Sequence, residues 1–113
     1  MEKVVVTGMG TVNPLGLSVS ESWEAAIHGR SGVGPITLFD ASDLEVQIAC
    51  EVKGFQAENY MSAKEARRRD RFQQFAAVAA QEALRVLHQQ VHLVAASQRA
   101  RESPDAVAAG SPP

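Results

Sequence analysis

The longest regular pattern of apolar positions lies in residues 72–87, where apolar side chains recur every three or four residues. This spacing puts them on one face of an α-helix and predicts that the face packs against a core. The stripe consists of Phe72, Phe75, Ala76, Ala79, Ala80, Ala83, Leu84 and Leu87. Val91 and Val94 partly continue it, and no turn signal occurs before Ser103. A helix is therefore predicted from about residue 70 to about Ala96.

Two stretches have the patterns of β-strands. Lys3 to Thr7, KVVVT, is a nearly continuous run of β-branched residues, which predicts a central strand covered on both faces. Residues 45–52 alternate instead, which predicts a half-buried strand. Its apolar face is Val46, Ile48, Cys50 and Val52. Cys50 is therefore expected to point inward as a small core residue, and it is not predicted to be a nucleophile.

The first predicted strand leads into a turn over residues 8–16, which contain glycines and one proline. A dinucleotide-binding fingerprint, GxGxxG, would begin at Gly8 and need a glycine where Asn13 stands, with an acidic residue ending a second strand about 20 residues later. Asn13 breaks the fingerprint. A nucleotide-binding oxidoreductase is thus an alternative that lacks its motif.

Two serines precede helical patterns with capping-box spacing, S-x-x-E. Ser18 begins an amphipathic helix of about Val19 to His28, which Gly29 ends. His28 lies at the C-terminal end, where capping is a better expectation than catalysis. Ser62 begins a short helix that carries a basic cluster.

Length and composition restrict the class of protein. The chain has 113 residues, enough for one domain, with 45% hydrophobic and 21% charged residues and a net charge of −2. This charge argues against a general nucleic-acid binder. The single cysteine excludes an internal disulfide and a CxxC metal site. With no apolar run of membrane-span length and no room for a signal peptide before Lys3, a cytoplasmic protein without membrane association is expected.

The basic cluster of residues 64–71 stands out because acidic residues outnumber basic ones in residues 1–63. Lys64, Arg67 and Arg68 are three and four positions apart, so their charges share one face of the short helix. Charge alone favours a solvated surface. The mutual repulsion of these cations would, however, be offset if the face met an acidic partner.

His88 and His92 are four positions apart, a spacing that can bind a metal ion on a helix. Two histidines without a third ligand are more typical of a polar helix face. No metal site and no cofactor is therefore predicted.

Several consecutive segments together resemble a known family. They are VVVTGMGTVNPLG, SWEAAIHGRSGVGPITLFDAS, EVKGF and YMSAKEARRRDRFQQFAAVAAQEAL. In this order and with these intervals, the chain from Lys3 to about Leu84 resembles the N-terminal portion of a β-ketoacyl-acyl-carrier-protein synthase of the long-chain (type II) kind. The resemblance implies the α/β class, as an incomplete N-terminal part of a thiolase-like fold.

The resemblance also implies an activity and a partner. In the family, an acyl chain is passed to a cysteine, assisted by two histidines and a lysine, and is condensed with malonyl-carrier protein as carbon dioxide is lost. The basic face of Lys64, Arg67 and Arg68 would dock the acidic acyl carrier protein. Intact members of the family are typically homodimers.

The family's catalytic residues are not matched in this chain. The nucleophilic cysteine of the family lies in a T-A-C-S-like turn, whereas Cys50 lies in I-A-C-E. His28, His88 and His92 match none of the family's catalytic histidines. The chain is therefore predicted to carry the docking face without the catalytic residues.

The resemblance fades beyond about Leu84. Residues 1–84 are interpreted as the synthase portion, and residues 85–113 as a divergent helical extension with a disordered tail after residue 103. A frameshift or a gene truncation would produce such a change, which is a hypothesis. The alternative is a non-catalytic interaction protein that uses the basic face of residues 64–71 and the helix of residues 70–96.

Overall fold

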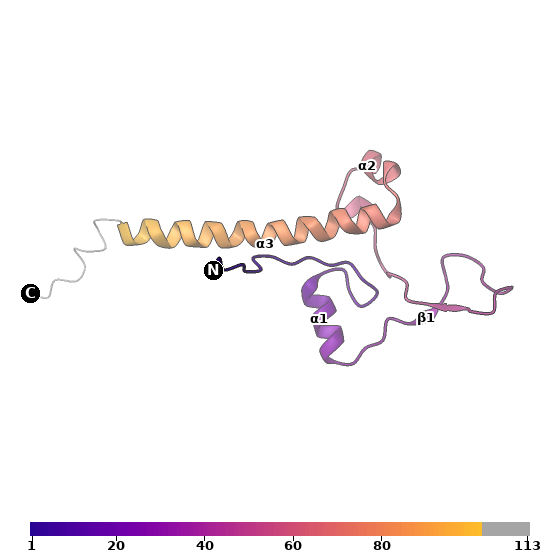
Figure 1. The fold of residues 1–113 in the computed structure, drawn as a ribbon. Coiled ribbons are helices and arrows are strands. Elements are labelled where there is room, and N and C mark those ends of the chain that lie inside the picture. The colour runs from indigo at the N-terminus through magenta and orange to yellow at the C-terminus, as the bar shows by residue number, and fades with distance from the viewer. Residues whose placement is uncertain (103–113) are drawn as a thin grey trace, which may run out of the picture.

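The computed structural model describes residues 1–102. The elements in chain order are α1 (Val19–Ile27), β1 (Gly34–Pro35), β2 (Ile48–Ala49), the short 3-10 helix η1 (Ala57–Asn59), α2 (Ala63–Arg68) and α3 (Arg71–Glu102). Helix α3 dominates the structure, with α1 and α2 lying beside its first half (Figure 1). The tail predicted to be disordered lies outside the described residues.

The helix starts follow the capping signals in the sequence. The side chain of Ser18 accepts a hydrogen bond from the backbone N–H of Glu21, and that of Ser62 accepts one from Glu65. His28 caps the C-terminus of α1, and its Nδ1 lies 2.8 Å from the carbonyl oxygen of Glu24. Both predicted N-caps and the capping role of His28 are confirmed.

The N-terminal segment runs along α3 (Figure 1). Gly8 and Gly10 lie so close to the helix that a Cβ atom on either would overlap a backbone carbonyl, of Ala83 and Ala79 respectively. These glycines therefore permit close packing of the segment on the helix, which is a role different from cradling a phosphate.

The packed face of α3 is rotated relative to the predicted apolar stripe. Val78 is buried, and Phe75, Ala79 and Ala83 are half-buried, whereas Phe72 and Leu84 are mostly exposed. The stripe prediction is therefore wrong for much of its length. The packed face also includes a polar residue, Glu82. An apolar pattern does not reveal a position of this kind.

The predicted central strand at Lys3 to Thr7 does not form, and this prediction is wrong for the structure. Val4 and Val6 are 93% and 81% exposed. A strand needs a neighbour to pair its backbone N–H and C=O groups. Within residues 1–102 the sheet consists of β1 and β2, and Lys3 to Thr7 pairs with neither strand. The segment consequently stays outside the sheet although its β-branched sequence favours a strand.

The second predicted strand is much shorter than its pattern. Strands β1 and β2 are antiparallel, with Gly34 opposite Ala49 and Pro35 opposite Ile48. Val46 and Ile48 are mostly exposed and Cys50 is exposed, so the predictions of a half-buried strand over residues 45–52 and of an inward Cys50 are wrong. Two residue pairs make too small a sheet to bury one face.

The described residues share a thin core. Four hydrophobic side chains within residues 1–102 are buried, and all are small: Ala25, Ala41, Ala57 and Val78. Position 84, where the synthase portion was predicted to end, lies inside α3, and this helix continues past Ala96 to Glu102. No helix in the described part of the chain is long and apolar enough to span a bilayer.

Candidate functional site

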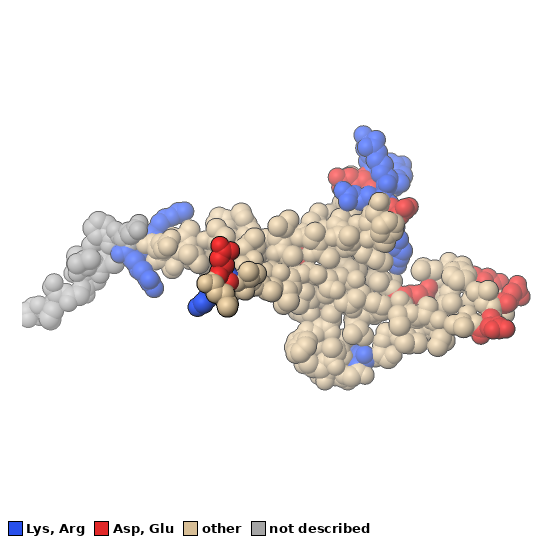
Figure 2. All heavy atoms as spheres, viewed as in Figure 1, with Lys and Arg blue, Asp and Glu red and all other residues tan. Residues whose placement is uncertain are grey.

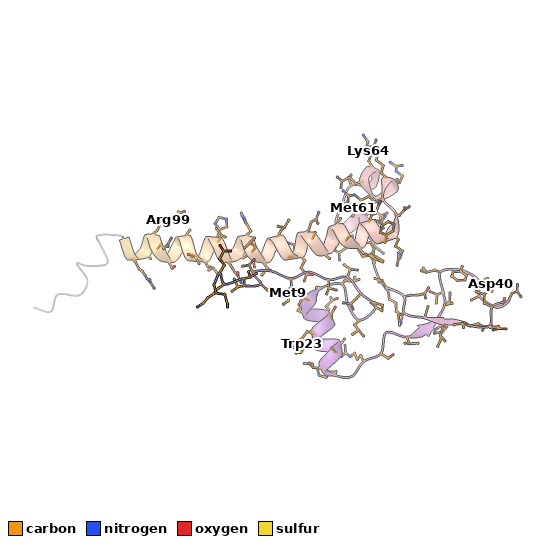
Figure 3. All side chains as sticks on the ribbon, viewed as in Figure 1. Met9, Trp23, Asp40, Met61, Lys64 and Arg99 are labelled. Carbon is orange, nitrogen blue, oxygen red and sulfur yellow. The ribbon has the colours of Figure 1, made fainter. Side chains whose placement is uncertain are left out.

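The candidate site is the surface of α2. Lys64, Arg67 and Arg68 are exposed on this helix, as the sequence predicts. Figure 2 shows basic side chains gathered on the lobe formed by α2, while an acidic cluster lies at the far tip of the hairpin. Figure 3 places Lys64 on that lobe and Asp40 at the hairpin tip. The molecule thus presents two separate, oppositely charged projections.

A side chain of α3 holds the C-terminal end of α2. The amide Nε2 of Gln74 donates hydrogen bonds to the carbonyl oxygens of Ala66, at 2.9 Å, and Arg69, at 3.3 Å. These carbonyls belong to the last turn of α2 and its C-cap, which a helix alone leaves without partners. Gln74 therefore fixes the end of α2 that carries Arg67 and Arg68. No sequence pattern predicts this role of Gln74.

Arg71 belongs to the basic cluster in sequence, but its side chain, although exposed, is bonded to another part of the chain. Its Nη2 donates to the carbonyl oxygen of Val52 at 3.0 Å. Its guanidinium carbon lies 4.9 Å from the ring centroid of Phe75 and 6.0 Å from that of Phe55, distances that allow cation–π attraction. Arg71 therefore stabilises the base of the lobe, whereas Arg69, the exposed C-cap of α2, lies next to the predicted face.

An aromatic cluster supports the lobe from below. The ring of Phe55 stacks on Tyr60, with centroids 5.5 Å apart, and meets the edge of Phe75 at 4.9 Å. The intervening η1 buries Ala57. Such ring pairs add to the stability that burial provides, so the basic face rests on a packed base.

Asn13 organises the turn after the N-terminal segment. Its Oδ1 accepts hydrogen bonds from the backbone N–H groups of Leu15 and Gly16, and its Nδ2 donates to the hydroxyls of Thr11 and Ser22. The residue that breaks the dinucleotide fingerprint therefore has a structural function of its own. This role was not predicted from the sequence, although an asparagine directly before Pro14 is a turn signal from which it could have been inferred.

Glu82 joins three parts of the chain. Its Oε2 accepts from the backbone N–H of Thr11 at 3.0 Å, and its Oε1 accepts from that of Val19 at 2.8 Å. Val19 is the first residue of α1, where backbone N–H groups have no partner within the helix. Bonds from backbone N–H groups to a carboxylate are stronger than neutral ones. Glu82 thus holds α1 and the turn against α3.

A wide groove lies beside this carboxylate, between the N-terminal segment, α1 and α3. Its volume is about 1040 Å³, and its lining is mostly apolar, including Val6, Met9, Trp23 and Val86. The cysteine and the three histidines, which were weighed as catalytic or metal-binding residues, do not line this groove. Cys50 lies in the hairpin, His28 ends α1, and His88 and His92 lie far along α3. Within residues 1–102, no three histidine, cysteine or acidic side chains cluster as a metal site would require.

Comparison with known sequences gives consistent results. The family model described as the N-terminal domain of β-ketoacyl synthases matches residues 1–107. The chain is 46% identical over 83 residues to the 3-oxoacyl-[acyl-carrier-protein] synthase 2 of Synechocystis sp.. It is 49% identical over 85 residues to the protein of the same name from Coxiella burnetii. Each match covers 74% of this chain and 20% of the relative, so the chain spans about a fifth of the length of these relatives.

Proposed function

The chain belongs to the β-ketoacyl synthase family, and from this membership we propose that it represents the N-terminal region of a fatty-acid-condensing synthase. Membership implies the thiolase-like fold. In the proposed reaction, malonyl-carrier protein loses carbon dioxide. The resulting carbon nucleophile attacks the carbonyl of an acyl thioester, where a carbon–carbon bond forms as the carbon–sulfur bond breaks.

The proposed contribution of this chain is the docking of acyl carrier protein by Lys64, Arg67 and Arg68. One observation carries this proposal: the three cations are exposed on a projecting helix, while Arg71 of the same cluster bonds to the carbonyl of Val52 and lies over the ring of Phe75. A row of exposed cations on a fixed helix attracts an acidic partner from a distance and sets its orientation. The names of the relatives include acyl carrier protein, which supports the choice of partner.

The proposal assigns no catalytic residue to this chain. Cys50 is exposed in the hairpin, and its I-A-C-E context differs from the T-A-C-S-like turn of the family's nucleophile. The same proposal includes three further expectations: the protein forms a homodimer, it is located in the cytoplasm, and it uses no cofactor. They are carried over from the family resemblance and from the cysteine content.

Charge reversal of the face tests the docking proposal. The double variant Lys64→Glu with Arg67→Glu removes two attractions and adds two repulsions. Each exposed pair contributes up to about 1 kcal/mol, so we expect carrier-protein affinity to fall by about tenfold or more. The remaining binding should depend less on salt. Titration of the 113-residue chain with acyl carrier protein at two salt concentrations measures both effects.

The matched control reverses two exposed arginines of α3 outside the face, Arg85→Glu with Arg99→Glu. This variant has the same net charge as the first. Equal loss of affinity in the two variants would reduce the docking proposal to a general charge effect, and unchanged affinity in the first would refute it.

A second candidate function is a non-catalytic interaction protein. The observation that favours it is the row of exposed apolar side chains on α3, which includes Leu84, Leu87 and Val91. Exposed apolar surface of this kind is typical of association. The same titration distinguishes the two candidates, because only the first requires binding to acyl carrier protein.

A further inference from the structure

Two histidines lie together on the second half of α3, away from the proposed docking face. His88 and His92 are exposed, and their Nε2 atoms are 3.0 Å apart. Their rings meet edge to face, with centroids 4.5 Å apart and planes at 82°. The groove beside Glu82 lies on a different side of the helix, because Val86 and Gln90 line that groove and neither histidine does. The pair has no role in the proposed docking.

The separation of the two nitrogens matches the geometry of a metal chelate. A divalent transition metal binds an imidazole nitrogen at about 2.0–2.1 Å. Two such bonds at a right angle place the nitrogens about 2.9 Å apart, and at a tetrahedral angle about 3.3 Å apart. The observed 3.0 Å lies between these values. We propose that His88 and His92 form a two-histidine binding site for a divalent transition metal ion.

Without metal, the two Nε2 atoms share a hydrogen bond in which one ring donates its N–H to the other. A bound metal ion takes the place of that proton and uses the lone pairs of both Nε2 atoms, so each ring then carries its proton on Nδ1. Because the metal competes with protons for these nitrogens, its affinity decreases as the pH is lowered.

The site favours metals that bind nitrogen. Imidazole suits nickel, copper and zinc, whereas magnesium and calcium prefer oxygen ligands. Within the described residues no third histidine, cysteine or acidic side chain joins the pair, so water would complete the coordination. The spacing predicted from sequence is thus supplemented by the convergence of the two nitrogens, which sequence alone does not show.

Metal binding should stabilise the second half of α3. The two ligands are one helical turn apart, and a metal ion that joins them holds this turn closed. The apolar side chains of this part of the helix, including Val91 and Leu93, are exposed and so contribute little burial to its stability. An increase in helical content on metal addition is therefore a second measurable effect.

The experiment titrates the 113-residue chain with Ni²⁺ by calorimetry and repeats the titration with Mg²⁺. All proteins carry Cys50→Ser, so that the thiol does not bind the metal. The matched variant His92→Gln with Gln90→His keeps the number of histidines but places them two positions apart, on different faces of the helix. His28→Ala is the second control, because Nδ1 of His28 is already bound to a carbonyl.

The expected result is one Ni²⁺ ion per chain, no binding of Mg²⁺, and a rise in far-ultraviolet circular dichroism of the helix. The moved-histidine variant should bind at least about tenfold more weakly, since its second ligand no longer binds intramolecularly. The His28→Ala variant should bind as the parent does. Equal affinity in the parent and the moved-histidine variant would overturn the proposal, as would loss of binding in His28→Ala.

Discussion

The two halves of α3 differ in their surroundings although they form one uninterrupted helix of 32 residues. In the first half, Gln74, Val78 and Glu82 contact other segments of the chain. In the second half, Leu87, Val91 and Val94 are all exposed by more than a third. The same kind of sequence therefore produces a packed helix in one half and a largely solvated one in the other.

This difference separates helix formation from burial. Both halves are rich in alanine, leucine, glutamine and arginine, which favour a helix through the local backbone. Burial depends instead on which distant segments pack against the helix, and here residues 8–19 pack against its first half. Helical periodicity thus predicted correctly that the helix forms. It did not predict correctly which face of the helix is packed.

The most direct test uses the same substitution in each half. Val78→Ala removes two methyl groups from a side chain that is 5% exposed and should lower the free energy of unfolding by about 2 kcal/mol. Val91→Ala, at 58% exposure, should change it by less than about 0.5 kcal/mol, since alanine also favours the helix. Urea unfolding followed by circular dichroism measures both. Similar losses in the two variants would show that the second half is packed as well.

Glu82 provides a test with a smaller expected effect. Glu82→Gln removes the charge and leaves one of the two backbone donors, at Thr11 or Val19, facing an NH₂ group. The opening free energy of these amides should fall by about 1 kcal/mol, seen as roughly fivefold faster hydrogen exchange. The exposed Glu24→Gln on α1 is the control and should leave both amides unchanged. Unchanged exchange in Glu82→Gln would mean that the charge of Glu82 contributes nothing to holding α1 and the turn against α3.

The hairpin provides the smallest effect, and it depends on pH. Burial acts to raise the pKa of Glu51, but hydrogen bonds from Thr37 and Leu38 and the charge of Lys53 hold it below its usual 4.5. Because the folded pKa is the lower one, this stabilisation is complete above pH 4.5 and is lost as the pH falls through the folded value. Nuclear magnetic resonance of the Thr37 and Leu38 amides between pH 6 and about pH 3 measures the loss.

Two variants of the hairpin carboxylates check this assignment. Glu51→Gln should make the Thr37 and Leu38 resonances insensitive to pH in this range. Glu45→Gln, on the same loop, should leave their pH dependence as it is. A pH response that persists in Glu51→Gln would assign it to another group.

The sequence predicted the features that depend on neighbouring residues. The capping serines, the extent of α1 and the shared exposed face of Lys64, Arg67 and Arg68 depend on positions within a few residues, and the structure has them as predicted. The family resemblance was likewise confirmed, because ordered motifs over the chain are specific.

Features that depend on distant segments were not predicted. Lys3 to Thr7 has the composition of a strand, but its state depends on a neighbouring strand that its own residues do not encode. The separation of Arg71 from the other cations depends on Phe55 and Val52, which lie well before it in sequence. The bonds of Glu82 depend on Thr11 and Val19, which lie 71 and 63 positions before it. In each case the sequence pattern does not show which distant segment of the chain the residue contacts.

The bonds of Glu82 also constrain the order in which the chain can assemble during its synthesis. Glu82 follows Val19 by 63 positions and Thr11 by 71. A ribosome that adds about 5–20 residues per second needs several seconds to cover that distance. During this delay Ser18 can already cap α1, because its partner is only three positions away. Residues 19–27 therefore lack the carboxylate that anchors α1 until Glu82 has been translated.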